Sequence, residues 1–225
     1  MITSIVKYLS KSNKNIVISY KTLRTLIGIL GILLPFICML GGWWFAKETV
    51  QSSISLYYYT NMRDFLVGLL FVVSLFLITY KGTLVIDLVV STLIGICGLG
   101  VSIFPCYIEQ CCLHGVGIFQ LYPKDSNIIH LTCAVLFFLL LALNSIFLFT
   151  RKQPNETPEK LVRNKIYITC GIVILICLLG LVISMAFLSP QQRESSRIFL
   201  ILETIALFAF GTSWLVKGQT IIPDK

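Results

Sequence analysis

Charged side chains are scarce in this sequence of 225 residues: they make up 12% of it, while apolar residues make up 56%. Soluble domains average roughly 25% charged residues. A soluble domain of this composition would lack the polar surface needed to cover its core. The scarcity therefore argues against an ordinary soluble domain and favours a single membrane domain.

Catalytic signatures are missing as well. The sequence has two histidines and no G-x-S-x-G, H-E-x-x-H or P-loop motif. The fragment Cys111-Cys112-x-His114 is reminiscent of a zinc site, but no second ligand pair stands at a known spacing. We therefore expect no cofactor and no bound metal.

Six long apolar stretches predict membrane-spanning helices. Each is close to the ~20 residues that an α-helix needs to cross a bilayer. We expect an all-α, polytopic membrane bundle of six helices at residues 25–217, with a basic cytoplasmic segment at 1–24 and a tail at 218–225. The stretches are Leu26–Ala46, Phe65–Tyr80, Leu84–Phe104, Ile128–Leu148, Ile166–Leu188 and Ile198–Val216.

The first half of the first stretch contains Gly28 and Gly31. Small residues allow the backbones of membrane helices to approach closely. We expect another helix to pack closely at this point.

Lysine and arginine are distributed unequally between the two sides of the predicted bundle. With the N-terminus in the cytoplasm, thirteen of the 18 fall inside, and the five outside are Lys47, Arg63, Lys124, Arg193 and Arg197. Positive residues concentrate in cytoplasmic loops, so we expect a protein of the cell membrane with both termini inside. The net charge of +8 is then a topology signal and does not predict a nucleic-acid partner.

Three of the eight cysteines lie in the loop after the third stretch, which this topology places outside. That compartment permits disulfides. Cys106 has two candidate partners, Cys111 and Cys112, and spacing alone does not choose between them.

Glu203 is the most informative polar residue, because it lies about five residues inside the last apolar stretch. An ionisable residue at such a depth costs at least ~2.5 kcal/mol on insertion scales, which makes it a candidate functional residue. The functional interpretation is a proton carrier, a general base or a ligand anchor. The structural alternative is a partner for Arg63 or His130, and the sequence favours neither.

The other ionisable residues have structural alternatives too, which are stronger for Arg63, His130 and Asp87 than for Asp64. Arg63 and Asp64 open the second stretch, where an arginine reaches headgroups and an aspartate stabilises the helix dipole. His130, near the start of the fourth stretch, is a candidate proton shuttle or an interfacial residue. Asp87 is expected to pair with Lys81 or Lys217.

The candidate ligand-binding residues all map to the outer third of the bundle, where they would line one outward-facing cavity. We expect its ligand to be amphiphilic, a membrane lipid or a lipid-linked headgroup. These residues are Glu203, Asp64, Arg63, His130, Tyr58 and Tyr59.

Three functions remain open at this stage. The first is binding or handling of a lipid-like amphiphile. The second is a membrane-embedded lipid hydrolase or transferase, in which Ser55 would be a nucleophile only if His130 and a carboxylate converge on it. The third is a structural or assembly protein that pairs with a second copy or another membrane protein. A roomy cavity around Glu203 would favour the first two, and a filled bundle with Glu203 ion-paired would favour the third.

Three segments carry a resemblance to known proteins: Tyr57–Gly68, the turn Tyr80-Lys81-Gly82, and Glu203 together with Phe210–Gly218. They resemble an uncharacterised group of small prokaryotic six-span proteins, and the layout of spans is similar to that of the DRAM/Sfk-type autophagy modulators. The chain also resembles the intramembrane ceramidase-like hydrolases, which use a serine, an aspartate and histidines around zinc. It offers Ser55, Asp64 and His130 for these roles but no terminal histidine pair.

Overall fold

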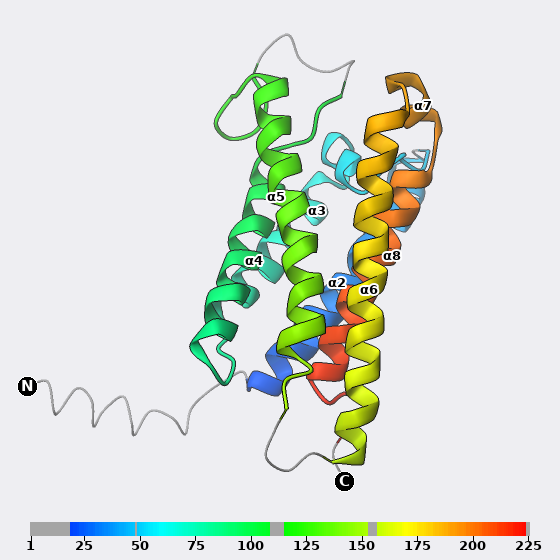
Figure 1. Ribbon diagram of the computed structural model, residues 1–225. Helices are drawn as coiled ribbons and strands as arrows, with labels where there is room; N and C mark the ends of the chain where they lie inside the picture. The colour runs from blue at the N-terminus through cyan, green and yellow to red at the C-terminus, as the bar shows by residue number, and fades with distance from the viewer. Residues whose placement is uncertain (1–18, 48, 109–114, 153–156, 224–225) are drawn as a thin grey trace, which may run out of the picture.

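The computed structural model describes residues 19–47, 49–108, 115–152 and 157–223 (Figure 1). Helices make up nearly all of the secondary structure in these residues, which contain no strand beyond one isolated β-bridge between Val116 and Leu121. The prediction of an all-α protein is confirmed. The long helices are α2 (Tyr20–Ala46), α3 (Arg63–Thr79), α4 (Val85–Ile103), α5 (Pro123–Leu143), α6 (Pro158–Phe187) and α8 (Ile198–Lys217). The short ones are η2 (Ser55–Tyr59), η3 (Asn144–Leu148) and α7 (Pro190–Ser195).

Five helices of the described chain are long and apolar enough to cross a membrane: α2, α4, α5 with η3, α6 and α8. Their outer faces carry large apolar side chains, and Ile96, Ile176 and Leu179 are 54%, 63% and 60% exposed. Exposed apolar surface on this scale is suited to contact with lipid. The protein is therefore membrane-embedded. Helix α3 has 17 residues and is shorter than these five, so its length does not establish a sixth span.

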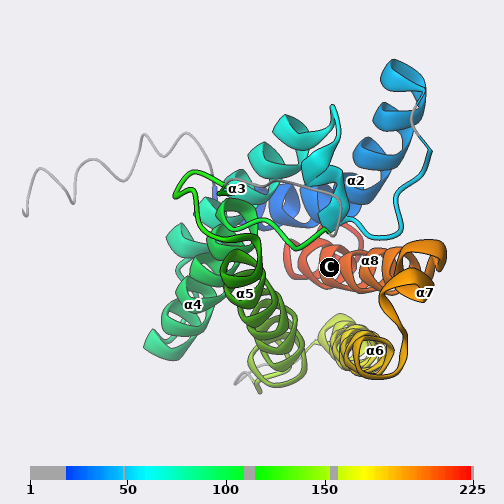
Figure 2. The same ribbon diagram turned by 90° about the horizontal axis from the view of Figure 1, so that it is seen from above.

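The six long helices run alternately up and down and close into a ring that follows the order of the chain (Figures 1 and 2). Each helix packs on the next, and α8 returns to pack on α2. At the α2–α8 crossing, a Cβ on Gly28 would lie 2.7 Å from the carbonyl oxygen of Gly211. The expected close approach at Gly28 is thus confirmed, and it holds the first and last helices together.

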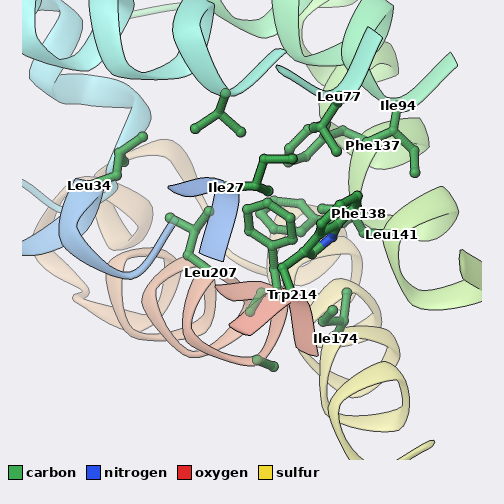
Figure 3. Packing of buried hydrophobic residues seen from close by; sticks show 14 of the residues in the cluster. Ile27, Leu34, Leu77, Ile94, Phe137, Phe138, Leu141, Ile174, Leu207 and Trp214 are labelled. Carbon is green, nitrogen blue, oxygen red and sulfur yellow. The ribbon is translucent and has the colours of Figure 1, made fainter. Parts of the chain in front are cut away.

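One end of the ring, where α2 begins and α8 ends, is filled by aromatic side chains; we call it the Lys217 end. Trp214 is 1% exposed, and its ring lies 5.0 Å from that of Tyr80 and 5.3 Å from that of Phe149, measured between centroids. Figure 3 shows Trp214 among Phe138, Leu141 and other core residues. Edge-to-face packing of this kind fills the ring interior at the Lys217 end. A cavity for a ligand must therefore lie at the opposite end of the ring.

Several helices extend past the apolar stretches that predicted them. Helix α5 begins five residues before Ile128, and α6 begins eight residues before Ile166. Each has proline in its first turn, and the Thr157 side chain accepts a hydrogen bond from the Lys160 N–H at the start of α6. Proline and a side-chain cap start a helix wherever they occur, whereas hydropathy marks only the part inside the membrane.

Candidate functional site

A cavity of about 530 Å³ opens at the other end of the ring, which we call the α7 end. The volume lies within the roughly 300–1,000 Å³ of small-molecule sites. Residues of all six long helices and of α7 line it, together with the segment between α2 and α3. Its polar lining includes Ser55, Tyr58, Asn127, His130, Arg193 and Glu203, and its apolar lining includes Leu34, Leu70, Phe138, Leu178 and Leu207. One cavity thus combines polar groups with an apolar wall that reaches toward the middle of the bundle.

Glu203 joins α8 to the start of η2. The Ile54 N–H donates to its Oε2 at 2.5 Å, and the Ser55 N–H donates to the same carboxylate. A second hydrogen bond between the same two segments runs from the Leu200 N–H to the Ser52 carbonyl oxygen at 2.9 Å. Free N–H groups at the start of a helical turn favour an anion, so this is a good position for a carboxylate. Within the described residues Glu203 forms no ion pair, and backbone amides replace the partners expected from the sequence, Arg63 and His130.

His130 and Ser55 form a hydrogen-bonded pair on the cavity wall. His130 is 4% exposed; its Nδ1 lies 2.7 Å from the Phe104 carbonyl oxygen and its Nε2 lies 3.2 Å from the Ser55 Oγ. A carbonyl oxygen only accepts, so Nδ1 must carry the proton. In the neutral ring Nε2 is then an acceptor, and the Ser55 hydroxyl donates to it.

The Phe104 carbonyl that orients His130 belongs to a segment held in place by its neighbours. The Ser126 hydroxyl donates to the Pro105 carbonyl oxygen at 2.9 Å, and the Tyr59 hydroxyl donates to that of Cys106 at 2.6 Å. The Tyr107 N–H donates to the Asn127 Oδ1 at 2.9 Å. These hydrogen bonds hold the segment after α4 against α5 and η2. They therefore also hold the Phe104 carbonyl oxygen, which accepts from His130.

Burial changes the ionisation of two groups beside this segment. It raises the pKa of the Cys106 thiol to about 12, with a further contribution from the negative charge of Glu203. It also raises the pKa of the Tyr59 phenol. Both groups are therefore neutral at physiological pH, and Tyr59 remains a hydrogen-bond donor.

Three of the six predicted ligand-binding residues line the cavity: Glu203, His130 and Tyr58. Tyr59 lies behind the wall, on the Cys106 carbonyl. Arg63 and Asp64 are exposed at the start of α3 and do not line the cavity. The Arg63 guanidinium lies 4.5 Å from the centre of the Tyr58 ring, and its Nη2 donates to the Tyr58 hydroxyl at 2.9 Å, so Arg63 meets the site only through that tyrosine.

Other polar residues, which were not predicted as members of the site, also line the cavity, and Asn127 and Arg193 are two of them. Asn127 lies one turn before His130 on α5. Arg193, on α7, donates through Nε and Nη2 to the Leu188 and Met185 carbonyl oxygens at 2.9 and 2.5 Å, which caps the end of α6. The sequence Ser189-Pro190-x-Gln192, a capping box, is the signal that predicts α7 and places Arg193 there.

The expected pairing of Asp87 with Lys81 or Lys217 is wrong. The Asp87 Oδ1 lies 3.1 Å from Nη1 of Arg151, and its Oδ2 accepts hydrogen bonds from the Thr83 and Leu84 N–H groups, both at 3.0 Å. Asp87 therefore caps its own helix, and its remaining oxygen meets the arginine that follows η3.

The cysteines of the outer loop are described in part. Cys106 is a buried free thiol. This free thiol does not agree with the predicted disulfide at Cys106; its two candidate partners, Cys111 and Cys112, and His114 lie outside the described residues. Within the described residues, no group of three histidine, cysteine or acidic side chains is placed to hold a metal ion.

No family model, curated protein or solved structure matches this chain. The function of the site is therefore inferred from its geometry.

Proposed function

We propose that this integral membrane protein binds a lipid-like amphiphile in the cavity at the α7 end. The observation that carries the proposal is the division of one 530 Å³ cavity into a polar part and an apolar part. Ser55, His130 and Glu203 offer hydrogen-bonding groups to a headgroup, and the apolar residues offer a wall to a chain. Ligand sites have this composition: mostly apolar, with a few placed polar groups.

The structural alternative has less support. In a purely structural bundle, we would expect Glu203 to be ion-paired and the ring interior to be packed throughout, as it is around Trp214. Glu203 instead lies on a cavity wall and is held by backbone amides. A carboxylate held in this way keeps lone pairs available for a hydroxyl or an ammonium group of a ligand.

We further infer that α3 is a sixth span and that the α7 end faces outward from the cell membrane. Helices α2 and α4 run in the same direction, so the chain must cross back along α3 (Figure 1). Its 17 residues extend about 25 Å at 1.5 Å per residue, close to the ~30 Å of a hydrocarbon core. Arg24, Arg151 and Lys160 lie near Lys217 at the opposite end, which favours that end, and both chain termini, in the cytoplasm.

Native mass spectrometry of the full chain, released from detergent micelles, tests the binding proposal. We expect the wild-type protein to retain a lipid-like molecule in stoichiometric amount. Ala134→Phe, which places a ring in the cavity, should lose it. Ile176→Phe on the exposed face of α6 is the matched control and should keep it. A wild-type protein that carries no amphiphile, or an Ala134→Phe protein that binds as well as wild type, would refute the proposal.

A further inference from the structure

The pair Ser55 and His130 has an arrangement that ligand binding alone does not require. The Ser55 hydroxyl donates to a neutral imidazole nitrogen at 3.2 Å, and the other ring nitrogen is held by a carbonyl at 2.7 Å. A nucleophile, a base in hydrogen-bond reach and a third group that orients the base are the recurring parts of an activated serine. The orienting group here is the Phe104 carbonyl, in the position that a carboxylate occupies in many such sites.

We propose that Ser55 is the nucleophile of an acyl transfer, with His130 as its general base, acting on a carboxylic ester of a long-chain lipid bound in the cavity. This inference rests on the proposed function, because it assigns chemistry to the same site. It needs no metal and no cofactor: a hydroxyl, a base and an ester suffice.

Hydrogen bonds to the backbone around Ser55 hold its hydroxyl in place beside His130. Glu203 accepts from the amides of Ile54 and Ser55, and the Leu56 N–H donates to the Ser53 Oγ at 3.2 Å, so the backbone on both sides of the nucleophile is fixed. Glu203 is therefore a positioning residue. Its carboxylate accepts from the backbone amides that precede and carry the serine, so it holds Ser55 in place opposite His130.

The reaction balances with groups that are present and one acceptor. As the Ser55 Oγ bonds to the ester carbon, its proton passes to the His130 Nε2. The carbon–oxygen bond of the ester then breaks, the leaving alcohol takes the proton from Nε2, and the acyl group remains on Ser55. Water, or the hydroxyl of a second lipid, attacks the acyl carbon and passes its proton to His130. That proton returns to the Ser55 oxygen as the acyl bond breaks.

The shape of the cavity suits this substrate class. Ser55 and His130 lie near the end of the bundle where the connecting segments meet, whereas Phe138 and Leu207 line the cavity deeper in the helices. An acyl chain lying along these apolar residues would bring its carbonyl carbon to the depth of the serine. Burial of the chain gains roughly 0.8 kcal/mol per methylene, which favours long-chain over short-chain esters.

The test is labelling of the purified full chain with a dodecyl fluorophosphonate, which reacts with activated serines, followed by peptide mass spectrometry. We expect one adduct, on Ser55. His130→Gln should slow its formation by about 10²–10⁴-fold, the usual contribution of a general base. Ser55→Ala should abolish it. Ser195→Ala, at the exposed end of α7 and outside the cavity lining, is the matched control and should label at the wild-type rate.

Bound lipid is measured on the same samples by native mass spectrometry, which separates the two proposals and reports whether each variant is folded. If wild type retains lipid but Ser55 labels no faster than other serines, or equally fast in His130→Gln, the acyl-transfer inference is overturned and binding stands. If Ser55 labels as expected but no amphiphile is retained, the binding proposal fails and the nucleophile stands.

Discussion

Replacement of Glu203 by alanine separates the structural contribution of its carboxylate from any role in binding. The side chain accepts from the Ile54 N–H at 2.5 Å and from the Ser55 N–H. A hydrogen bond to a charged group contributes about 1.5–3 kcal/mol, and a buried donor left without a partner costs about 1–3 kcal/mol. Because the cavity gives water partial access to the freed amides, we expect Glu203→Ala to lower the free energy of unfolding by about 3 kcal/mol.

Glu203→Gln retains an acceptor oxygen of the same size but loses the charge. We therefore expect a loss of only about 1 kcal/mol, the difference between a charged and a neutral acceptor. Insertion should remain intact in both variants. If Glu203 also anchors the ligand, the glutamine variant should lose bound amphiphile by more than this small destabilisation explains.

The assay is equilibrium unfolding in mixed micelles, combined with hydrogen exchange of the Ile54 and Ser55 amides. Glu194→Ala removes an exposed carboxylate on α7 and is the control, expected within about 0.5 kcal/mol of wild type. A Glu203→Ala protein with wild-type stability and wild-type exchange at these two amides would refute the reasoning.

Three further predictions concern other parts of the molecule. Only the thiolate reacts with maleimide, and burial raises the pKa of Cys106 from 9.0 to about 12. In a variant with all other cysteines replaced, labelling of Cys106 at pH 8 should therefore be about 10³-fold slower than labelling of an exposed cysteine. The labelling rate should rise tenfold per pH unit well beyond pH 9, and a plateau near pH 9 would contradict the raised pKa. Gly28→Ala should lower the free energy of unfolding by about 1–3 kcal/mol, because the added Cβ meets the backbone of α8. Gly68→Ala is the control and should cause no such loss, because the space around Gly68 is open. If the two variants had equal free energies of unfolding, the close α2–α8 crossing would be disproved. A double-mutant cycle with Asp87→Asn and Arg151→Gln should give a coupling of up to about 1 kcal/mol, as for partly exposed ion pairs, and no measurable coupling would mean that the pair adds nothing.

The positions of the membrane helices could be predicted because a bilayer imposes a length and a composition on any segment that crosses it. All six apolar stretches coincide with helices, and five of these are long and apolar enough to span. The close crossing at Gly28 was predictable for a similar reason, since only small residues let helices come so near. Helix starts in polar sequence, such as that of α6, were not, because hydropathy carries no information about caps.

Glu203 and His130 could be selected from the sequence because a polar group at membrane depth is costly and needs a compensating environment. The identity of that environment could not be read in the same way. Glu203 is held by backbone amides, which every residue possesses and no sequence pattern marks. Arg63 and Asp64 were also predicted members of the site, but the rotation of α3 within the ring leaves both exposed and turns Leu66 inward.

The amino-acid sequence by itself determined that this chain is an all-α membrane protein and which ionisable residues are expensive to bury, because both follow from transfer free energies that depend on local composition. Only the tertiary structure decided that the Ser55 hydroxyl meets the ring of His130, 75 residues further along the chain, on the wall of a cavity. A hydrogen bond between side chains depends on the packing, rotation and register of several helices at once, and no local pattern encodes that combination.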